Sequence, residues 1–123
     1  MRKLILLILT FLFFSHLYSF NNKCEEGISN IDEAYNYARK AYNASNIDDL
    51  HNYIKKAKSY AEDAQRDFDE CNCADAESSA DDCYTYSRRA YSESNFEDAK
   101  DYAKKAMRSA EDSKSEAEDC NQR

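Results

Sequence analysis

The sequence is poor in the residues that make tight turns, with one Gly and no Pro in 123 residues, and it lacks Trp. Hairpin-rich β folds and phosphate-binding loops depend on glycine and proline at their turns, so both classes are excluded. The length allows one small domain. The composition therefore favours a small protein built from helices.

Long hydrophobic runs are absent except at the N-terminus. Arg2 and Lys3 precede an unbroken apolar run over residues 4–14, and small polar residues follow at Ser15 and Ser19. This layout is typical of a secretory signal peptide, and the run is short for a membrane span, which needs about 20 apolar residues. We expect a signal peptide at residues 1–19, with an uncleaved anchor as the alternative. The prediction is a secreted or periplasmic protein without stable membrane insertion after cleavage.

Basic residues are outnumbered in the rest of the chain. Residues 20–123 carry 15 Lys and Arg against 24 Asp and Glu, a net charge of −9. Nucleic acids and anionic membranes repel such a chain, so neither is expected as a partner. Within residues 20–123 Val is absent, and Leu, Ile and Phe together number eight. Disorder is a concern at so low an apolar content, so helical periodicity is needed to exclude it.

An internal repeat carries most of the information. A shift of 49 residues superimposes residues 34–72 on residues 83–121 with 17 identities in 39 positions, and it also places Cys24 on Cys73. We interpret this as a duplication, with one unit at residues 20–72 and the next at residues 73–123. A weaker echo after about 16 residues inside the units suggests four helices.

The spacing of small and apolar residues predicts long helices. From Ile47 to Cys71 these residues follow one another at alternating steps of three and four, which forms one helical stripe. Asn46 and Asn95 are suited to cap the helices that follow them, and turns of about two residues join antiparallel neighbours. The predicted fold is all-α: two tandem antiparallel hairpins, forming a four-helix bundle or a short helical solenoid.

Cysteine positions predict two disulfides in an exported chain. In a hairpin that turns near residues 45–46, Cys24 and Cys71 meet at the open end, and the repeat makes Cys73 and Cys120 their equivalents. We therefore expect the pairs Cys24–Cys71 and Cys73–Cys120. A metal site at Cys71 and Cys73 is the alternative, which one intervening residue and missing histidines disfavour, so no cofactor is expected.

Cys83 has no partner in this scheme. It takes the place of Ala34 in the repeat and shares an apolar face with Ala76 and Ala80. A small buried thiol is the favoured interpretation, and an intermolecular disulfide that forms a homodimer is the alternative. A reactive thiol is less favoured because no histidine lies nearby in sequence.

The sequence contains no set of residues typical of catalysis. His51 is the only histidine after residue 19 and is read as a surface residue, because Lys100 replaces it in the second unit. Carboxylates crowd the segment between the units, and we favour a solvated acidic face over a weak divalent-cation site because the spacing is not that of a calcium loop. These carboxylates are Asp67, Asp69, Glu70, Asp75, Glu77, Asp81 and Asp82.

A motif of the form Tyr-x-[Lys/Arg]-[Lys/Arg]-Ala occurs four times, beginning at Tyr37, Tyr53, Tyr86 and Tyr102. Its favoured interpretation is structural, and the alternative is an interaction face for a protein partner. Asn43 also heads a sequence that fits a glycosylation acceptor. We expect a binding or structural role without catalysis; the alternative is a protein that binds a small ligand or divalent cation through the acidic segment.

Overall fold

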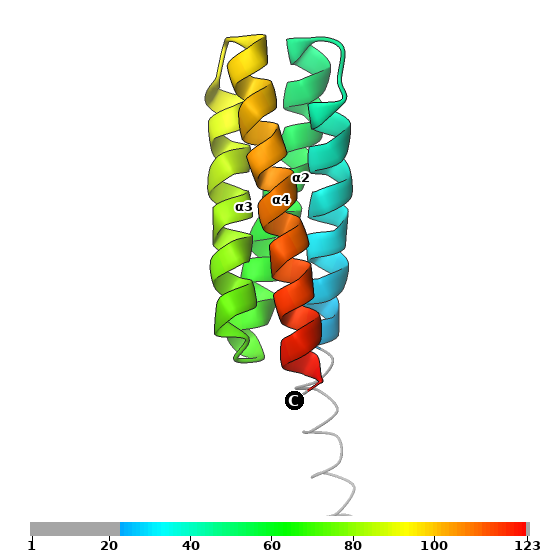
Figure 1. Cartoon of the computed structure of the whole chain (residues 1–123), viewed down its shortest axis with the longest axis vertical. Coiled ribbons are helices and arrows are strands. Elements are labelled where there is room, and N and C mark those ends of the chain that lie inside the picture. Colours follow the sequence, from blue (N-terminus) through cyan, green and yellow to red (C-terminus); the bar gives the residue numbers. More distant parts are fainter. Residues whose placement is uncertain (1–22, 123) are drawn as a thin grey trace, which may run out of the picture.

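The computed structural model describes residues 23–122, which form four helices, so the all-α prediction is confirmed (Figure 1). The first helix covers residues 23–42 and is followed by α2 (Ile47–Glu70), α3 (Ala74–Ser92) and α4 (Phe96–Asn121). The predicted signal peptide, residues 1–19, lies outside the described residues. Within the described part, no helix has the length and apolar character needed to cross a membrane.

Two short turns at one end of the molecule are held by asparagine caps. Asn46 Oδ1 accepts a hydrogen bond from the Asp49 amide at 2.8 Å, and Asn95 Oδ1 accepts one from the Asp98 amide at 3.0 Å. Each cap contributes about 1 kcal/mol, and the acidic first turns also suit the helix dipole. The two capped turns lie side by side at the top of Figure 1.

The link between α2 and α3 lies at the other end and is unusually tight. Asn72 adopts a left-handed conformation, with φ of 59°. The Cys73 amide donates to the Phe68 carbonyl at 3.0 Å, and the Asn72 amide donates to the Asp69 carbonyl at 3.2 Å. This is the Schellman pattern of helix termination, with asparagine in the place that glycine usually fills. As a result, Cys71 and Cys73 both lie at this end of the bundle.

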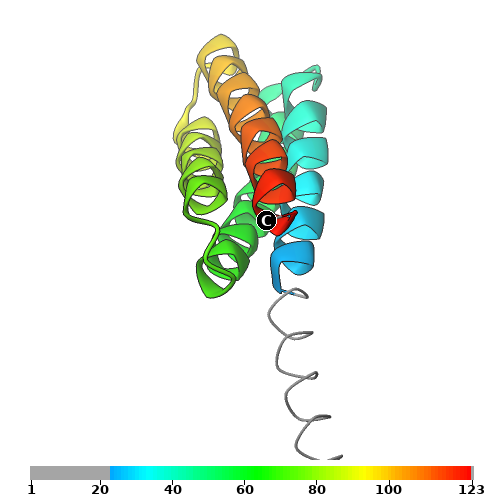
Figure 2. The ribbon, with the colours of Figure 1, turned by 60° about the horizontal axis from the view of Figure 1, so that its bottom comes forward.

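The four helices pack as a closed bundle. In ring order, α3 lies between α2 and α4, and α4 returns to the side of the first helix (Figures 1 and 2). The last contact includes an ion pair between Lys114 Nζ and Asp32 Oδ1 at 2.8 Å. Contact between the first and last helices distinguishes a bundle from an open solenoid, so the bundle alternative holds.

Within residues 23–122 the core is built mainly from alanine, which supplies 14 of the 22 buried hydrophobic residues. Its four largest side chains come from the first helix and α2: Ile31, Leu50, Ile54 and Phe68. A shift of 49 residues places alanine at every equivalent position: Ala80, Ala99, Ala103 and Ala117. Large side chains from the first helix and α2 thus pack against small ones from α3 and α4, which fills the core without overpacking.

Two disulfides close the end opposite the capped turns, and their predicted pairing is confirmed. Cys24 is bonded to Cys71 with a Cα–Cα distance of 5.5 Å, and Cys73 is bonded to Cys120 with 6.0 Å. Each links residues 47 positions apart, for which chain entropy predicts a stabilisation of about 4 kcal/mol. These disulfides are compatible with an extracytoplasmic protein.

Candidate functional site

Charge divides unevenly along the bundle axis. The half next to the capped turns, residues 35–58 and 84–107, holds ten Lys and Arg against six Asp and Glu. The half next to the disulfides, residues 23–34, 59–83 and 108–122, holds four Lys and Arg against 18 Asp and Glu. We call these the turn half and the disulfide half; their net charges are +4 and −14. An acidic protein therefore carries a local cationic surface.

Most cations of the turn half lie over tyrosine rings at 5.0–6.0 Å from the ring centroid. We call this group the tyrosine–cation belt. Its cations are Arg39, Lys40, Lys56, Lys58, Arg89, Lys100, Lys104 and Lys105, and its rings are Tyr35, Tyr37, Tyr42, Tyr86, Tyr91 and Tyr102. Each such contact contributes about 0.5–1 kcal/mol at exposed sites. Eight of the ten cations are thus held against the bundle surface.

The groove between the first helix and α2 shows the arrangement most fully. The Tyr37 ring stacks on Tyr60 with centroids 5.7 Å apart and planes 7° from parallel. Lys40 lies 5.0 Å from the centre of the Tyr37 ring, and Lys56 lies 5.3 Å from it. One ring therefore carries two ammonium groups, both attached to exposed residues.

The groove between α3 and α4 repeats this arrangement with a different second ring. Tyr86 stacks on Tyr102 with centroids 6.5 Å apart, and the Lys105 ammonium lies 5.7 Å from the Tyr86 centre and 5.4 Å from the Tyr102 centre. Under the 49-residue shift, the contact of Lys105 with the Tyr86 ring is equivalent to the contact of Lys56 with the Tyr37 ring. The other two grooves also have such contacts, Lys58 over Tyr91 and Lys100 over Tyr42, so the belt surrounds the bundle.

The four tyrosines singled out in the sequence do not form one face. Tyr37 and Tyr53 lie beside the groove between the first helix and α2, whereas Tyr86 and Tyr102 lie in the opposite groove between α3 and α4. The sequence motif marks the belt rings Tyr37, Tyr86 and Tyr102, but its fourth tyrosine, Tyr53, is not a belt ring, and it omits Tyr35. It also omits Tyr42 and Tyr91, whose rings contact cations of neighbouring helices, which a pattern within one helix cannot indicate.

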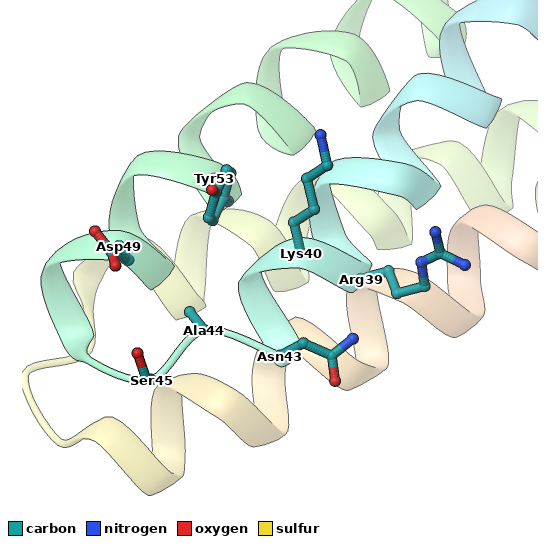
Figure 3. Close-up of a pocket in the computed structure, with 7 residues that line it drawn as sticks. All are labelled: Arg39, Lys40, Asn43, Ala44, Ser45, Asp49 and Tyr53. Carbon is teal, nitrogen blue, oxygen red and sulfur yellow. The ribbon is translucent and has the colours of Figure 1, made fainter.

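A cavity of about 510 Å³ opens beside the first capped turn (Figure 3). Arg39 and Lys40 of the first helix and Tyr53 of α2 contribute to its wall, and Asp49 is its acidic member. Asn43, the candidate glycosylation acceptor, is exposed at its rim. The cavity joins cationic and aromatic groups and is continuous with the tyrosine–cation belt through Arg39 and Lys40.

The carboxylates around the link between α2 and α3 do not converge on a point. Among the described residues, the carboxylates form no group of three close enough to share an ion. Asp67 is buried and accepts a hydrogen bond from Asn30 Nδ2 at 2.8 Å. Burial raises the pKa of the Asp67 carboxyl, and the Asn30 hydrogen bond and nearby Lys23 oppose that rise. Asp67 therefore packs against the first helix and is hydrogen-bonded to it.

Cys83 and His51 both lie between helices. Cys83 is unpaired and fully buried, and burial raises the pKa of its thiol to about 12. An intermolecular disulfide at Cys83 would require the surrounding packing to open.

His51 Nε2 lies 2.9 Å from the Glu93 carbonyl oxygen, and its ring lies 5.5 Å from that of Tyr91. His51 thus joins α2 to the end of α3.

The two disulfides touch each other, which the cysteine spacing did not reveal. Cys24 Sγ lies 3.4 Å from Cys73 Sγ, although these atoms belong to different disulfides. The Sγ atoms of Cys24, Cys71 and Cys73 all lie within 4.8 Å of one another and are buried. Because all three are oxidised here, this cluster offers sulfur–sulfur chemistry rather than free thiolates for a metal.

Comparison with known proteins identifies no relative from which a function could be inferred: no protein-family model, no curated protein and no solved structure matches this chain.

Proposed function

We propose that this chain is an exported, non-catalytic binding protein, made of two duplicated helical hairpins, that docks an acidic segment of a protein partner on its tyrosine–cation belt. One observation carries the proposal: eight of the ten cations in the turn half lie over tyrosine rings. The contrast between +4 in this half and −14 in the other directs a partner's negative charge to the belt.

Holding the cations in place favours binding for an entropic reason. A free lysine or arginine side chain loses up to about 2 kcal/mol of rotamer freedom when it is immobilised. A side chain that already lies over a ring has lost part of that freedom before the partner arrives, so less is lost on association. Tyrosine, which supplies every ring of the belt, is also enriched in the central residues of protein interfaces.

Repeated hydrogen bonds support the duplication. Asn30 donates to Asp67 at 2.8 Å in the first hairpin, and the Ser79 hydroxyl donates to Glu116 at 2.9 Å in the second. The 49-residue shift places Asn30 on Ser79 and Asp67 on Glu116. The residue types differ, but equivalent positions are hydrogen-bonded in both hairpins, as expected of two copies that have diverged from one hairpin.

Contacts between the hairpins support a pseudo-twofold arrangement. Lys100 of the second hairpin lies over Tyr42 of the first, and His51 of the first lies against Tyr91 of the second. The shift places His51 on Lys100 and Tyr42 on Tyr91, so the two contacts are reciprocal. Such reciprocity is the property of an isologous interface. The belt then presents the same kind of groove on two opposite sides.

Export is inferred from two independent features. The two disulfides persist in an oxidising compartment, and residues 1–19 have the layout of a cleaved signal. We place the protein outside the cytoplasm, in a periplasm or secreted. Binding of a divalent cation or small ligand by the acidic segment is the weaker candidate, because its carboxylates do not converge.

Affinity capture from the native extracellular fraction, with paired variants, tests the proposal. Lys56→Gln with Lys105→Gln removes one equivalent cation from each hairpin groove, and we expect this pair to reduce capture of the partner about tenfold or more. The matched control is Glu62→Gln with Glu111→Gln, which changes equivalent exposed residues in the disulfide half.

The control pair should retain the partner, and added salt should weaken capture because the belt acts through charge. The proposal is wrong if both pairs of variants lose the partner equally, or if no protein is captured by the unmodified chain. Binding of calcium by titration calorimetry, with loss of heat in an Asp75→Asn variant, would favour the cation-binding alternative instead.

A further inference from the structure

The disulfide end holds a small cavity that is separate from the belt. It has a volume of about 170 Å³, and its wall includes both sulfur-bearing residues of the Cys73–Cys120 disulfide. Cys120 is partly exposed, whereas Cys24, Cys71 and Cys73 are buried to between 2 and 4 % exposure. Of the two disulfides, Cys73–Cys120 is therefore the one that a reagent from solution can reach first.

We propose that this cavity admits a small cationic thiol, which opens the Cys73–Cys120 disulfide at Cys120 and passes the exchange on to the Cys24–Cys71 disulfide. The assignment is independent of the partner-binding function proposed above. It rests on the cavity, on the different exposure of the four cysteines, and on the contact between sulfurs of the two disulfides.

Helix geometry determines which sulfur is attacked. Cys73 is the N-cap residue of α3, where the helix dipole stabilises a thiolate, whereas Cys120 lies in the last turn of α4, where the dipole disfavours one. The more stable thiolate leaves faster in thiol–disulfide exchange. An incoming thiolate therefore bonds to Cys120 Sγ, the bond between Cys120 and Cys73 breaks, and Cys73 departs as the thiolate.

The Cys73 thiolate is released next to a second disulfide. Its Sγ lies 3.4 Å from Cys24 Sγ, and loss of the bond to Cys120 frees the Cys73 side chain to rotate into line with the Cys24–Cys71 bond. When the Cys24–Cys73 bond forms, the Cys24–Cys71 bond breaks and Cys71 takes up the proton that the incoming thiol lost. The products are a mixed disulfide at Cys120, a Cys24–Cys73 disulfide and a free Cys71 thiol, with no net oxidation or reduction of the system.

The walls of the cavity select the charge of the thiol. Asp75, Glu116 and Asp119 line it together with the disulfide. Carboxylates repel an anionic thiol and attract one that carries an ammonium group. Cysteamine is the simplest probe of this class, and mercaptoethanesulfonate is its anionic counterpart.

The test uses the oxidised full-length chain in a Cys83→Ser background, so that every free thiol detected has been released by exchange. The protein is treated briefly with cysteamine, quenched in acid, alkylated in denaturant and mapped by mass spectrometry with fragmentation between residues 71 and 73. We expect the cysteamine adduct on Cys120 and the alkyl label on Cys71. An alkyl label on Cys73 with Cys24–Cys71 intact would overturn the transfer step, and an adduct on any other cysteine would overturn the site.

A second variant separates the two steps. With Cys24→Ala and Cys71→Ala, the acceptor disulfide is absent, so the adduct should still form on Cys120 while the label moves to Cys73. Failure of Cys120 to react in this variant would show that the cavity does not admit the thiol.

Charge selectivity is measured as the rate of adduct formation with cysteamine divided by that with mercaptoethanesulfonate, relative to the same ratio in the unfolded chain. We expect a preference on the order of 10-fold from carboxylates a few ångströms away. Asp75→Asn with Glu116→Gln should reduce it several-fold, while Asp101→Asn, in the turn half, should leave it unchanged. Equal ratios in the folded and unfolded chain would overturn the assignment of a cationic thiol.

Discussion

The ring of Phe68 occupies the space that a side chain at position 27 would need. A Cβ atom added to Gly27 would lie 2.7 Å from Phe68 Cδ1 and 3.0 Å from Cζ, and closer still to Cε1. Real Cβ atoms essentially never approach a neighbour so closely, and Phe68 is fully buried. In the second hairpin the 49-residue shift places Ala76 and Ala117 at these two positions. The only glycine in the chain is thus matched to its largest core side chain.

Gly27→Ala should destabilise the bundle. Overpacking costs about 1–3 kcal/mol, which exceeds the gain of about 1 kcal/mol from replacing glycine by alanine in a helix. In a Phe68→Leu background the same change should become neutral or stabilising, because the ring is gone. Chemical denaturation of the four proteins in this cycle measures the coupling. A stabilising Gly27→Ala in the unmodified chain would contradict the close packing.

Removing either disulfide should lower the free energy of unfolding by a similar amount. Cys24→Ala with Cys71→Ala and Cys73→Ala with Cys120→Ala each open a loop of the same length, worth about 4 kcal/mol in the chain-entropy estimate. We expect losses of about 2–4 kcal/mol in the free energy of unfolding for each pair, measured by denaturant titration. An Ala-rich core gives the chain little reserve, so removal of both pairs should leave it largely unfolded. A loss confined to one of the two pairs would show that the loops do not act equivalently.

Asp67 should make stability depend on pH. Burial raises the pKa of its carboxyl above the ordinary value of 3.8, so the folded state holds the proton more tightly than the unfolded state does. The free energy of unfolding therefore falls as pH rises from 3.8 through the folded-state pKa, and then stays level. Asp67→Asn keeps an oxygen to accept the hydrogen bond of Asn30 and avoids this loss.

The stability of Asp67→Asn relative to the unmodified protein should thus increase with pH over that window. Asp69→Asn, which removes the same formal charge at an exposed neighbouring position, is the control. Thermal unfolding at several pH values gives both differences. A relative stability of Asp67→Asn that does not change with pH would contradict a perturbed carboxyl.

Cys83 should report on global unfolding. At pH 8, a thiol with a pKa of about 12 is ionised to only about one part in ten thousand, and its burial excludes reagents as well. Iodoacetamide should therefore label Cys83 slowly in the native protein and rapidly in denaturant. Rapid labelling without denaturant, or a disulfide-linked dimer on a non-reducing gel, would show instead that the packing around Cys83 opens.

Local features were predictable because they depend on one helix or one hairpin. The capping asparagines follow from residue type and position, since Asn46 and Asn95 each precede acidic first turns. The disulfide pairing follows from the geometry of an antiparallel hairpin combined with the repeat. The left-handed Asn72 was not expected, because asparagine is only an occasional substitute for glycine at helix ends.

The helices, their caps and the two disulfide pairs could be predicted from the sequence, because spacing along the chain controls all three. Packing between helices, which spacing along the chain does not encode, places Lys100 over Tyr42 and Cys24 against Cys73 where the two hairpins meet. Within the first hairpin it places Gly27 against Phe68. Alanine stripes look alike from helix to helix, so they allow several rotations of one hairpin against the other. The few large core side chains and the tight link at Asn72 select among these rotations, and with them the belt and the sulfur cluster.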